Sequence, residues 1–99
     1  MPYSYLLLKA AQEEYESSIG WYNERSWIAA DEFIESVEHA LELICDHPTR
    51  WRNEYHQYHE LGLKKYPYSI IYRIDEEQEL VIVTSIYHHR RNPKKKYKR

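Results

Sequence analysis

Two apolar segments in the second half of the chain constrain its fold more than any other feature. Between residues 68 and 74, large apolar side chains alternate with Ser69, Ile71 and Arg73. This period of two predicts a β-strand with one face toward a core. Residues 80–86 (LVIVTSI) are apolar or β-branched on both faces, which is typical of a central strand covered on at least one side. With the polar residues 75–79 between them, the two segments are predicted to form an antiparallel hairpin.

The first half of the chain has a helical period instead. Residues 3–8 (YSYLLL) predict a short edge strand. From about residue 9 to 24, one face of an amphipathic helix is formed by Ala11, Tyr15, Ser18, Ile19 and Tyr22. A second helix is predicted from 27 to 46, with Ser26 as its N-cap and His47-Pro48 as its end.

These segments predict an α+β fold in which a two-helix hairpin packs on one face of an antiparallel sheet. Residues 49–58 show no clean period and are interpreted as a loop. Residues 58–66 are predicted to be the first strand of a three-stranded meander, with Gly62 as a site for a β-bulge. The element order is therefore β-α-α-β-β-β. The predicted core consists of Phe33, Val37, Leu41, Ile70, Tyr72, Ile82 and Ile86.

Length and composition predict one domain spanning residues 1–99. A 99-residue chain with 42% hydrophobic residues can bury a core without covalent staples. A single cysteine, Cys45, cannot form an internal disulfide, and its interpretation is that of a small buried hydrophobe. No apolar run approaches the roughly 20 residues that cross a bilayer, and no leader pattern is present. We therefore expect a cytoplasmic protein that does not contact a membrane.

Charge is distributed unevenly along the chain. The formal net charge is −2, but residues 10–47 contain ten acidic side chains and only one basic side chain, Arg25. Residues 88–99 contain seven Lys or Arg and no acid. An acidic helical body with a basic C-terminal tail can still present a cationic patch to phosphate. The alternative is that this tail is only a solvated chain end.

The residues that follow the last strand could support phosphate chemistry. RNA cleavage by the ribose 2′-hydroxyl needs a base, an acid and cations on the phosphate. His88 or His89 could supply the base or acid, but neighbouring strand residues point to opposite faces, so only one can face such a site. Arg90 and Arg91 could clamp phosphate, and Lys94, Lys95 and Lys96 could add affinity for the nucleic-acid backbone.

Other polar and aromatic residues are assigned no chemistry. His47, His56 and His59 lack cysteine partners and a fixed spacing, so neither a metal site nor another cofactor is predicted. Trp21, Trp27 and Trp51 lie near predicted helix ends or in a loop, where packing is their expected role.

Several motifs together resemble the RelE/ParE superfamily of bacterial toxins. They are KYPYSIIYRI, the apolar strand after it, HHRRNP, the WY at the end of the first helix, and Ile44-x-x-x-Pro48 at the end of the second. The resemblance covers nearly the whole chain. It implies a small α+β sandwich and a cognate antitoxin, whose acidic segment we expect to cover the sheet and the tail.

The superfamily contains two kinds of toxin. RelE-like members cut messenger RNA on the ribosome, whereas ParE-like members poison DNA gyrase. By resemblance, Arg90 and Tyr97 fall at or within about one position of catalytic residues of RelE-like enzymes, and Lys64 and Lys65 lie on their RNA-holding strand. In this chain, His59 and Glu60 stand where many relatives carry an arginine.

The leading prediction is a metal-free, ribosome-dependent mRNA endoribonuclease with Arg90, His88 and Tyr97 as catalytic residues. RNA would be bound by Lys64 and Lys65 and, in the C-terminal tail, by Arg91, Lys94, Lys95 and Lys96. The first alternative is a gyrase inhibitor without nuclease activity, and the second is a non-toxic protein-interaction module. The predicted partners are the antitoxin and either the ribosome with its mRNA or DNA gyrase.

Overall fold

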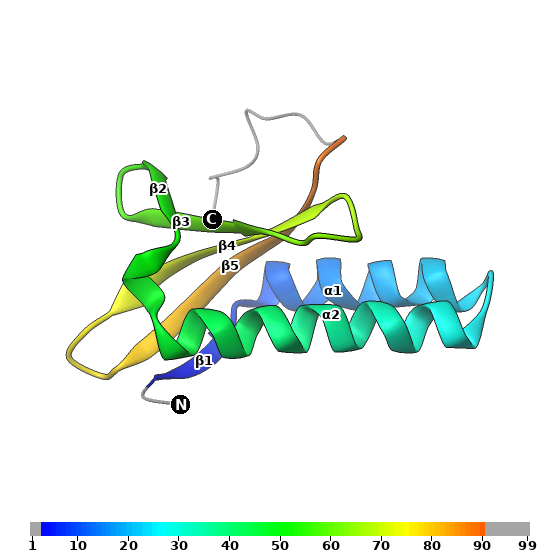
Figure 1. Cartoon of the computed structure of the whole chain (residues 1–99), viewed down its shortest axis with the longest axis horizontal. Helices are drawn as coiled ribbons and strands as arrows, with labels where there is room; N and C mark the ends of the chain where they lie inside the picture. Colours follow the sequence, from blue (N-terminus) through cyan, green and yellow to red (C-terminus); the bar gives the residue numbers. More distant parts are fainter. Residues whose placement is uncertain (1–2, 91–99) are drawn as a thin grey trace.

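The computed structural model describes residues 3–90, and these residues form two long helices and a mixed β-sheet (Figure 1). Helix α1 spans Lys9–Asn23 and helix α2 spans Trp27–Asp46, which confirms both predicted helices to within one residue. The Ser26 side chain accepts a hydrogen bond from the Ala29 N–H at 3.4 Å, as expected of an N-cap. Helix α2 ends just before His47-Pro48 because the residue preceding proline is disfavoured in the α conformation.

In the described part of the chain the sheet has five strands in the order β1-β5-β4-β3-β2. Their bounds are β1 Ser4–Leu7, β2 Arg52–Tyr55, β3 Tyr58–Gly62, β4 Tyr68–Asp75 and β5 Leu80–His88. Strands β3, β4 and β5 form the predicted antiparallel meander. The fold class and the order of the predicted elements, β-α-α-β-β-β, are thereby confirmed, with β2 as an additional strand between α2 and β3.

The sheet is nevertheless mixed, because the edge strand β1 runs parallel to β5. Sequence periodicity shows which residues face a core but not the direction in which a strand pairs. Parallel strands need a long connection, and the two helices begin that connection here.

Two local expectations in the middle of the chain were wrong. The stretch interpreted as a loop contains a 3₁₀ turn at Pro48–Arg50 and strand β2, which pairs with β3 through an irregular register. A four-residue strand is too short to show a clean period. Strand β3 ends at Gly62 rather than at residue 66, because the Leu63 N–H bonds to the Tyr68 carbonyl and turns the chain into β4.

The register irregularity predicted at Gly62 lies elsewhere in the sheet. Gly62 pairs regularly with Ser69, whereas the β4–β5 register shifts between Ile71 and Tyr72. Ile71 pairs with Ser85 but Tyr72 pairs with Val83, so that Thr84 is the extra residue.

All seven predicted core residues are buried. Phe33 lies at the centre of an aromatic group between the helices and the sheet, where its ring contacts those of Tyr22, Tyr66 and Tyr68. Just after the C-terminal end of α2, the Pro48 carbonyl accepts a hydrogen bond from the Tyr72 hydroxyl at 2.6 Å. Burial raises the Tyr72 pKa strongly, which keeps this hydroxyl protonated and able to donate.

The face of the sheet away from the helices also has a small buried cluster, made of Tyr58, Ile71 and Tyr87. Ile71 belongs to the row predicted to be mixed, yet it is fully buried. The alternation of β4 therefore separates two apolar clusters rather than a core from solvent.

Both helices cover the same face of the sheet, and the turn that joins them extends beyond the strands (Figure 1). Within residues 3–90, no helix is long and apolar enough to cross a membrane. The end of β5 lies near the C-terminal half of α1, where His88 shares a groove with Trp21 and Tyr22.

Candidate functional site

His88, the last residue of β5, lies on the helix side of the sheet. Its ring meets the ring of Tyr68 edge-on, with centroids 4.8 Å apart. Its Nδ1 accepts a hydrogen bond from the Arg90 backbone N–H at 3.0 Å, so the neutral ring carries its proton on Nε2. Burial, together with the positive charge of Arg90, lowers the pKa of His88. The ring therefore favours the neutral form near pH 7.

His89 points to the other side of the sheet, as the alternation of a strand predicts. Its Nε2 lies 2.8 Å from the Ser69 hydroxyl, which is buried. Its backbone N–H donates to the Pro67 carbonyl at 2.8 Å. Both bonds hold the segment that follows β5 against the start of β4. The geometry therefore gives His89 a structural role.

His88 and Arg90 line a groove of about 510 Å³ beside α1, here called the α1 groove. The rest of its wall comes from α1 and from the start of β4, namely Ser17, Ser18, Trp21, Tyr22, Pro67 and Tyr68. Burial raises the pKa of the Tyr22 hydroxyl, which remains a hydrogen-bond donor at neutral pH. The α1 groove thus combines hydroxyl groups, aromatic rings, one imidazole and one guanidinium.

Carboxylates of α1 lie next to this groove. A second hollow of about 360 Å³ shares His88 and Tyr68 with the α1 groove and is also lined by Glu13 and Glu14. The Glu14 carboxylate accepts hydrogen bonds from the Ser85 hydroxyl at 2.9 Å and from the Ile86 N–H at 3.1 Å. It therefore caps the edge of β5 beyond the point where β1 ends.

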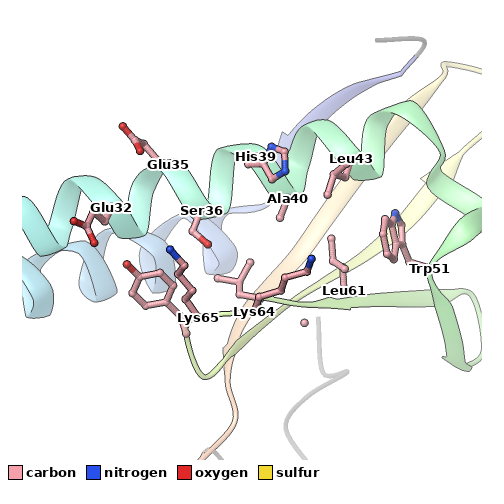
Figure 2. A pocket seen from close by; sticks show the side chains of 13 residues that line it. Glu32, Glu35, Ser36, His39, Ala40, Leu43, Trp51, Leu61, Lys64 and Lys65 are labelled. Carbon is pink, nitrogen blue, oxygen red and sulfur yellow. The ribbon is translucent and has the colours of Figure 1, made fainter.

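Lys64 and Lys65 line a different groove, the α2 groove, between helix α2 and the segment after β3 (Figure 2). Its volume is about 700 Å³. In Figure 2 the Lys65 side chain points toward α2, whereas Lys64 extends along the groove toward Leu61. Helix α2 contributes Glu32 and Glu35 to the same groove. The two predicted RNA-binding lysines therefore share a groove with carboxylates of α2.

The floor of the α2 groove is apolar, and Trp51 closes one end of it. Among the described residues, the indole Nε1 of Trp51 is a buried polar atom without a hydrogen-bond partner. The backbone carbonyl of Trp51 lies 3.0 Å from Nδ1 of His59, whose ring stacks on Tyr72. His59 is thus part of the packing under the groove.

The structure brings together only some of the residues selected from the sequence. His88 and Arg90 are adjacent, whereas Lys64 and Lys65 belong to the other groove. Arg91, Tyr97 and the lysines Lys94, Lys95 and Lys96 lie outside the described residues. Within residues 3–90, no group of three or more His, Cys, Asp or Glu side chains is placed to hold a metal ion.

Sequence reasoning missed the aromatic wall of the α1 groove. Trp21 was expected to pack, but it is half exposed. Ser17 and Trp21, like Ser18 and Tyr22, are spaced four residues apart on α1, and this spacing places them on one face. The spacing was visible in the sequence, but the partner of that face was not.

Comparisons with known proteins give one family and one fold. Residues 5–93 match the family model described as "ParE toxin of type II toxin-antitoxin system, parDE". A comparison with curated proteins found no match.

Several solved structures are similar in fold. A chain of the chromosomal ParDE system from Pseudomonas aeruginosa is similar with a TM-score of 0.73 and 12% identity, over 88% of this chain and 96% of that one. The Escherichia coli RelBE complex is similar with a TM-score of 0.60 and 14% identity, over 90% and 99%. The Mycobacterium tuberculosis RelBE2 complex is similar with a TM-score of 0.59 and 22% identity, over 89% and 99%.

Proposed function

Because this chain belongs to the ParE toxin family of type II toxin–antitoxin systems, we propose that it inhibits DNA gyrase and is neutralised by a cognate antitoxin. Gyrase inhibition is the activity that the resemblance implies for ParE-like members. The antitoxin partner is supported by two structural neighbours, the RelBE and RelBE2 complexes, which are toxin–antitoxin complexes.

One observation favours gyrase inhibition over RNA cleavage, namely the separation of the basic residues into two grooves. A metal-free ribonuclease needs its base, its acid and its cations around a single phosphate. Among the described residues, His88 and Arg90 lie in the α1 groove, whereas Lys64 and Lys65 lie in the α2 groove, which Glu32 and Glu35 also line. The acidic side chains beside both grooves repel phosphate, and they do not disfavour a protein surface.

The direct test is induction of the protein in a bacterial host, followed by plasmid supercoiling and messenger RNA end mapping in the same cells. Inhibited supercoiling or double-strand breaks with intact messages is the expected result. New RNA ends inside reading frames, with normal supercoiling, would overturn the proposal. Co-expression of the neighbouring antitoxin gene is the matched control, and it should restore both growth and supercoiling.

A second candidate function is the mRNA endoribonuclease, and the His88–Arg90 pair favours it. The lowered pKa of His88 gives a neutral imidazole whose Nε2–H could donate to a phosphate oxygen, next to a guanidinium that could stabilise its charge. To act as a general base, the ring would first have to release the Arg90 N–H from Nδ1. Tyr97 would be the further catalytic residue, with Lys64, Lys65 and the cations from Arg91 to Lys96 binding RNA.

The two candidates differ in what a substitution of Arg90 does. For a nuclease, Arg90→Ala should reduce cleavage by about 10²–10³-fold while the fold and antitoxin binding are kept. Arg73→Ala is a matched control, because Arg73 pairs with Ile82 well before the end of β5. Unchanged cleavage in Arg90→Ala would exclude this role for Arg90.

A further inference from the structure

We propose that the end of the helical hairpin is a docking surface for the protein target of this toxin. The surface consists of Trp21, Arg25, Trp27 and Ile28 and is here called the hairpin-tip patch. The identity of the target as gyrase rests on the proposed function, but the patch itself is inferred from its own geometry.

The patch exposes large apolar side chains that a folded protein normally buries. Trp21 is 50% exposed, Trp27 is 67% exposed and Ile28 is 51% exposed. All three lie within about one helical turn of the connection between α1 and α2. Clustered exposure of this kind marks an interaction surface, whereas single exposed hydrophobic residues do not.

One part of the patch is already held in place. The Arg25 guanidinium carbon lies 3.5 Å from the centroid of the Trp21 ring, and Arg25 donates a hydrogen bond to the Trp21 carbonyl at 2.6 Å. The Tyr22 ring meets Trp21 edge-on, with centroids 5.0 Å apart. Trp and Arg dominate binding energy at protein interfaces, and a side chain fixed before docking loses less entropy on binding.

The patch is continuous with the α1 groove, because Trp21 belongs to both. A partner seated on Trp21 can therefore reach His88 and Arg90 along the same side of the molecule. Arg25 and Arg90 are the two guanidinium groups of this continuous surface. The partner that fits is a protein with an apolar hollow flanked by carboxylates.

The surrounding charge favours a protein over a nucleic acid. Helix α1 carries Glu13 and Glu16, and Glu24 lies 3.8 Å from Arg25. A duplex or single strand brought to Trp21 would set its phosphates against these carboxylates. A protein surface can instead pair its own groups with both signs of charge.

The experiment uses the purified toxin, full-length and freed from its antitoxin, in wild-type form and as Trp21→Ala and Trp27→Ala. Binding to purified gyrase, inhibition of supercoiling and binding to the antitoxin are measured for each. Each substitution should weaken gyrase binding by roughly tenfold or more and leave antitoxin affinity unchanged. Leu6→Ala on β1 is the matched control for gyrase binding, since Leu6 is 48% exposed and lies outside the patch, and it should leave gyrase binding unchanged.

The outcomes separate the patch from the proposed function. Wild-type binding with variants within about twofold of it would overturn the patch, as would a selective loss of antitoxin binding. If the wild type neither binds nor inhibits gyrase, the gyrase proposal fails. Growth inhibition at matched expression then tests the patch alone: reduced toxicity of both variants supports it, and full toxicity overturns it. Thermal melting of each variant excludes unfolding as the cause.

Discussion

Replacing Phe33 with alanine should cost more stability than most substitutions in this chain, because the ring joins both helices to the sheet. Phe33 is fully buried. Its ring centroid lies 4.8 Å from that of Tyr22 on α1, 5.1 Å from Tyr68 on β4 and 5.3 Å from Tyr66. Tyr15 adds a fourth ring at 6.1 Å. Loss of this one side chain therefore leaves a cavity that three elements line.

The expected loss is about 3–5 kcal/mol. Returning a buried phenylalanine side chain to water accounts for about 1.5–3 kcal/mol, and the cavity that remains supplies most of the rest. Each aromatic pair can add about 0.5–1.5 kcal/mol beyond its buried area, although such terms are not additive. A domain of this size has a free energy of unfolding of about 5–15 kcal/mol. Phe33→Ala should thus remove at least about a fifth of it.

Equilibrium unfolding in urea measures this loss. With a denaturant dependence of about 1.5 kcal/mol per molar urea, the midpoint should fall by about 2–3 M. Phe33→Leu keeps an apolar side chain of similar volume and should cost about 1 kcal/mol. The exposed control Leu6→Ala should stay within about 0.5 kcal/mol of the wild type. A loss below about 1 kcal/mol in Phe33→Ala would refute the central role of this ring.

Three further substitutions test other contacts by the same unfolding assay. Ser26→Ala should cost about 1 kcal/mol because the first turn of α2 loses its cap, whereas Ser26→Asn should keep most of that stability. Tyr72→Phe should cost about 1–3 kcal/mol because the Pro48 carbonyl loses its buried donor, and wild-type stability in this variant would contradict that bond. The pKa of His88 is lowered by burial and by Arg90, so the unfolded state binds the proton more readily, and stability should fall as pH drops below about 6.5. His88→Gln should lose less unfolding free energy than the wild type between pH 7.5 and 5.5. An equal loss in both proteins would show that His88 does not cause this pH dependence.

Much of the fold was predictable because local physics decided it. The spacing of apolar residues on both helices, the Ser26 cap and the His47-Pro48 stop depend on interactions within a few residues. The alternation in β4 and the apolar run in β5 likewise identified two strands and most of the core. The motifs KYPYSIIYRI and HHRRNP indicated the toxin superfamily, and the family match over residues 5–93 confirmed it.

The candidate site was predictable only in part. The opposite orientation of His88 and His89 follows from the pleat of a strand, and the structure confirms it. The grouping of Lys64 with Arg90 did not follow, because both are merely basic residues on or beside strands. Only the structure places Lys64 in a groove with Glu32, and Arg90 in a groove with Trp21.

The sequence by itself therefore determined both helices, the strands β1, β4 and β5, the main core and the family of this protein. Tertiary structure alone decided that β1 runs parallel to β5, that residues 52–55 pair as a strand, and which side chains share a groove. Periodicity reports how one segment meets an average apolar surface. Strand direction, irregular pairing and groove composition depend instead on contacts between segments far apart in the chain, and no local pattern encodes those contacts.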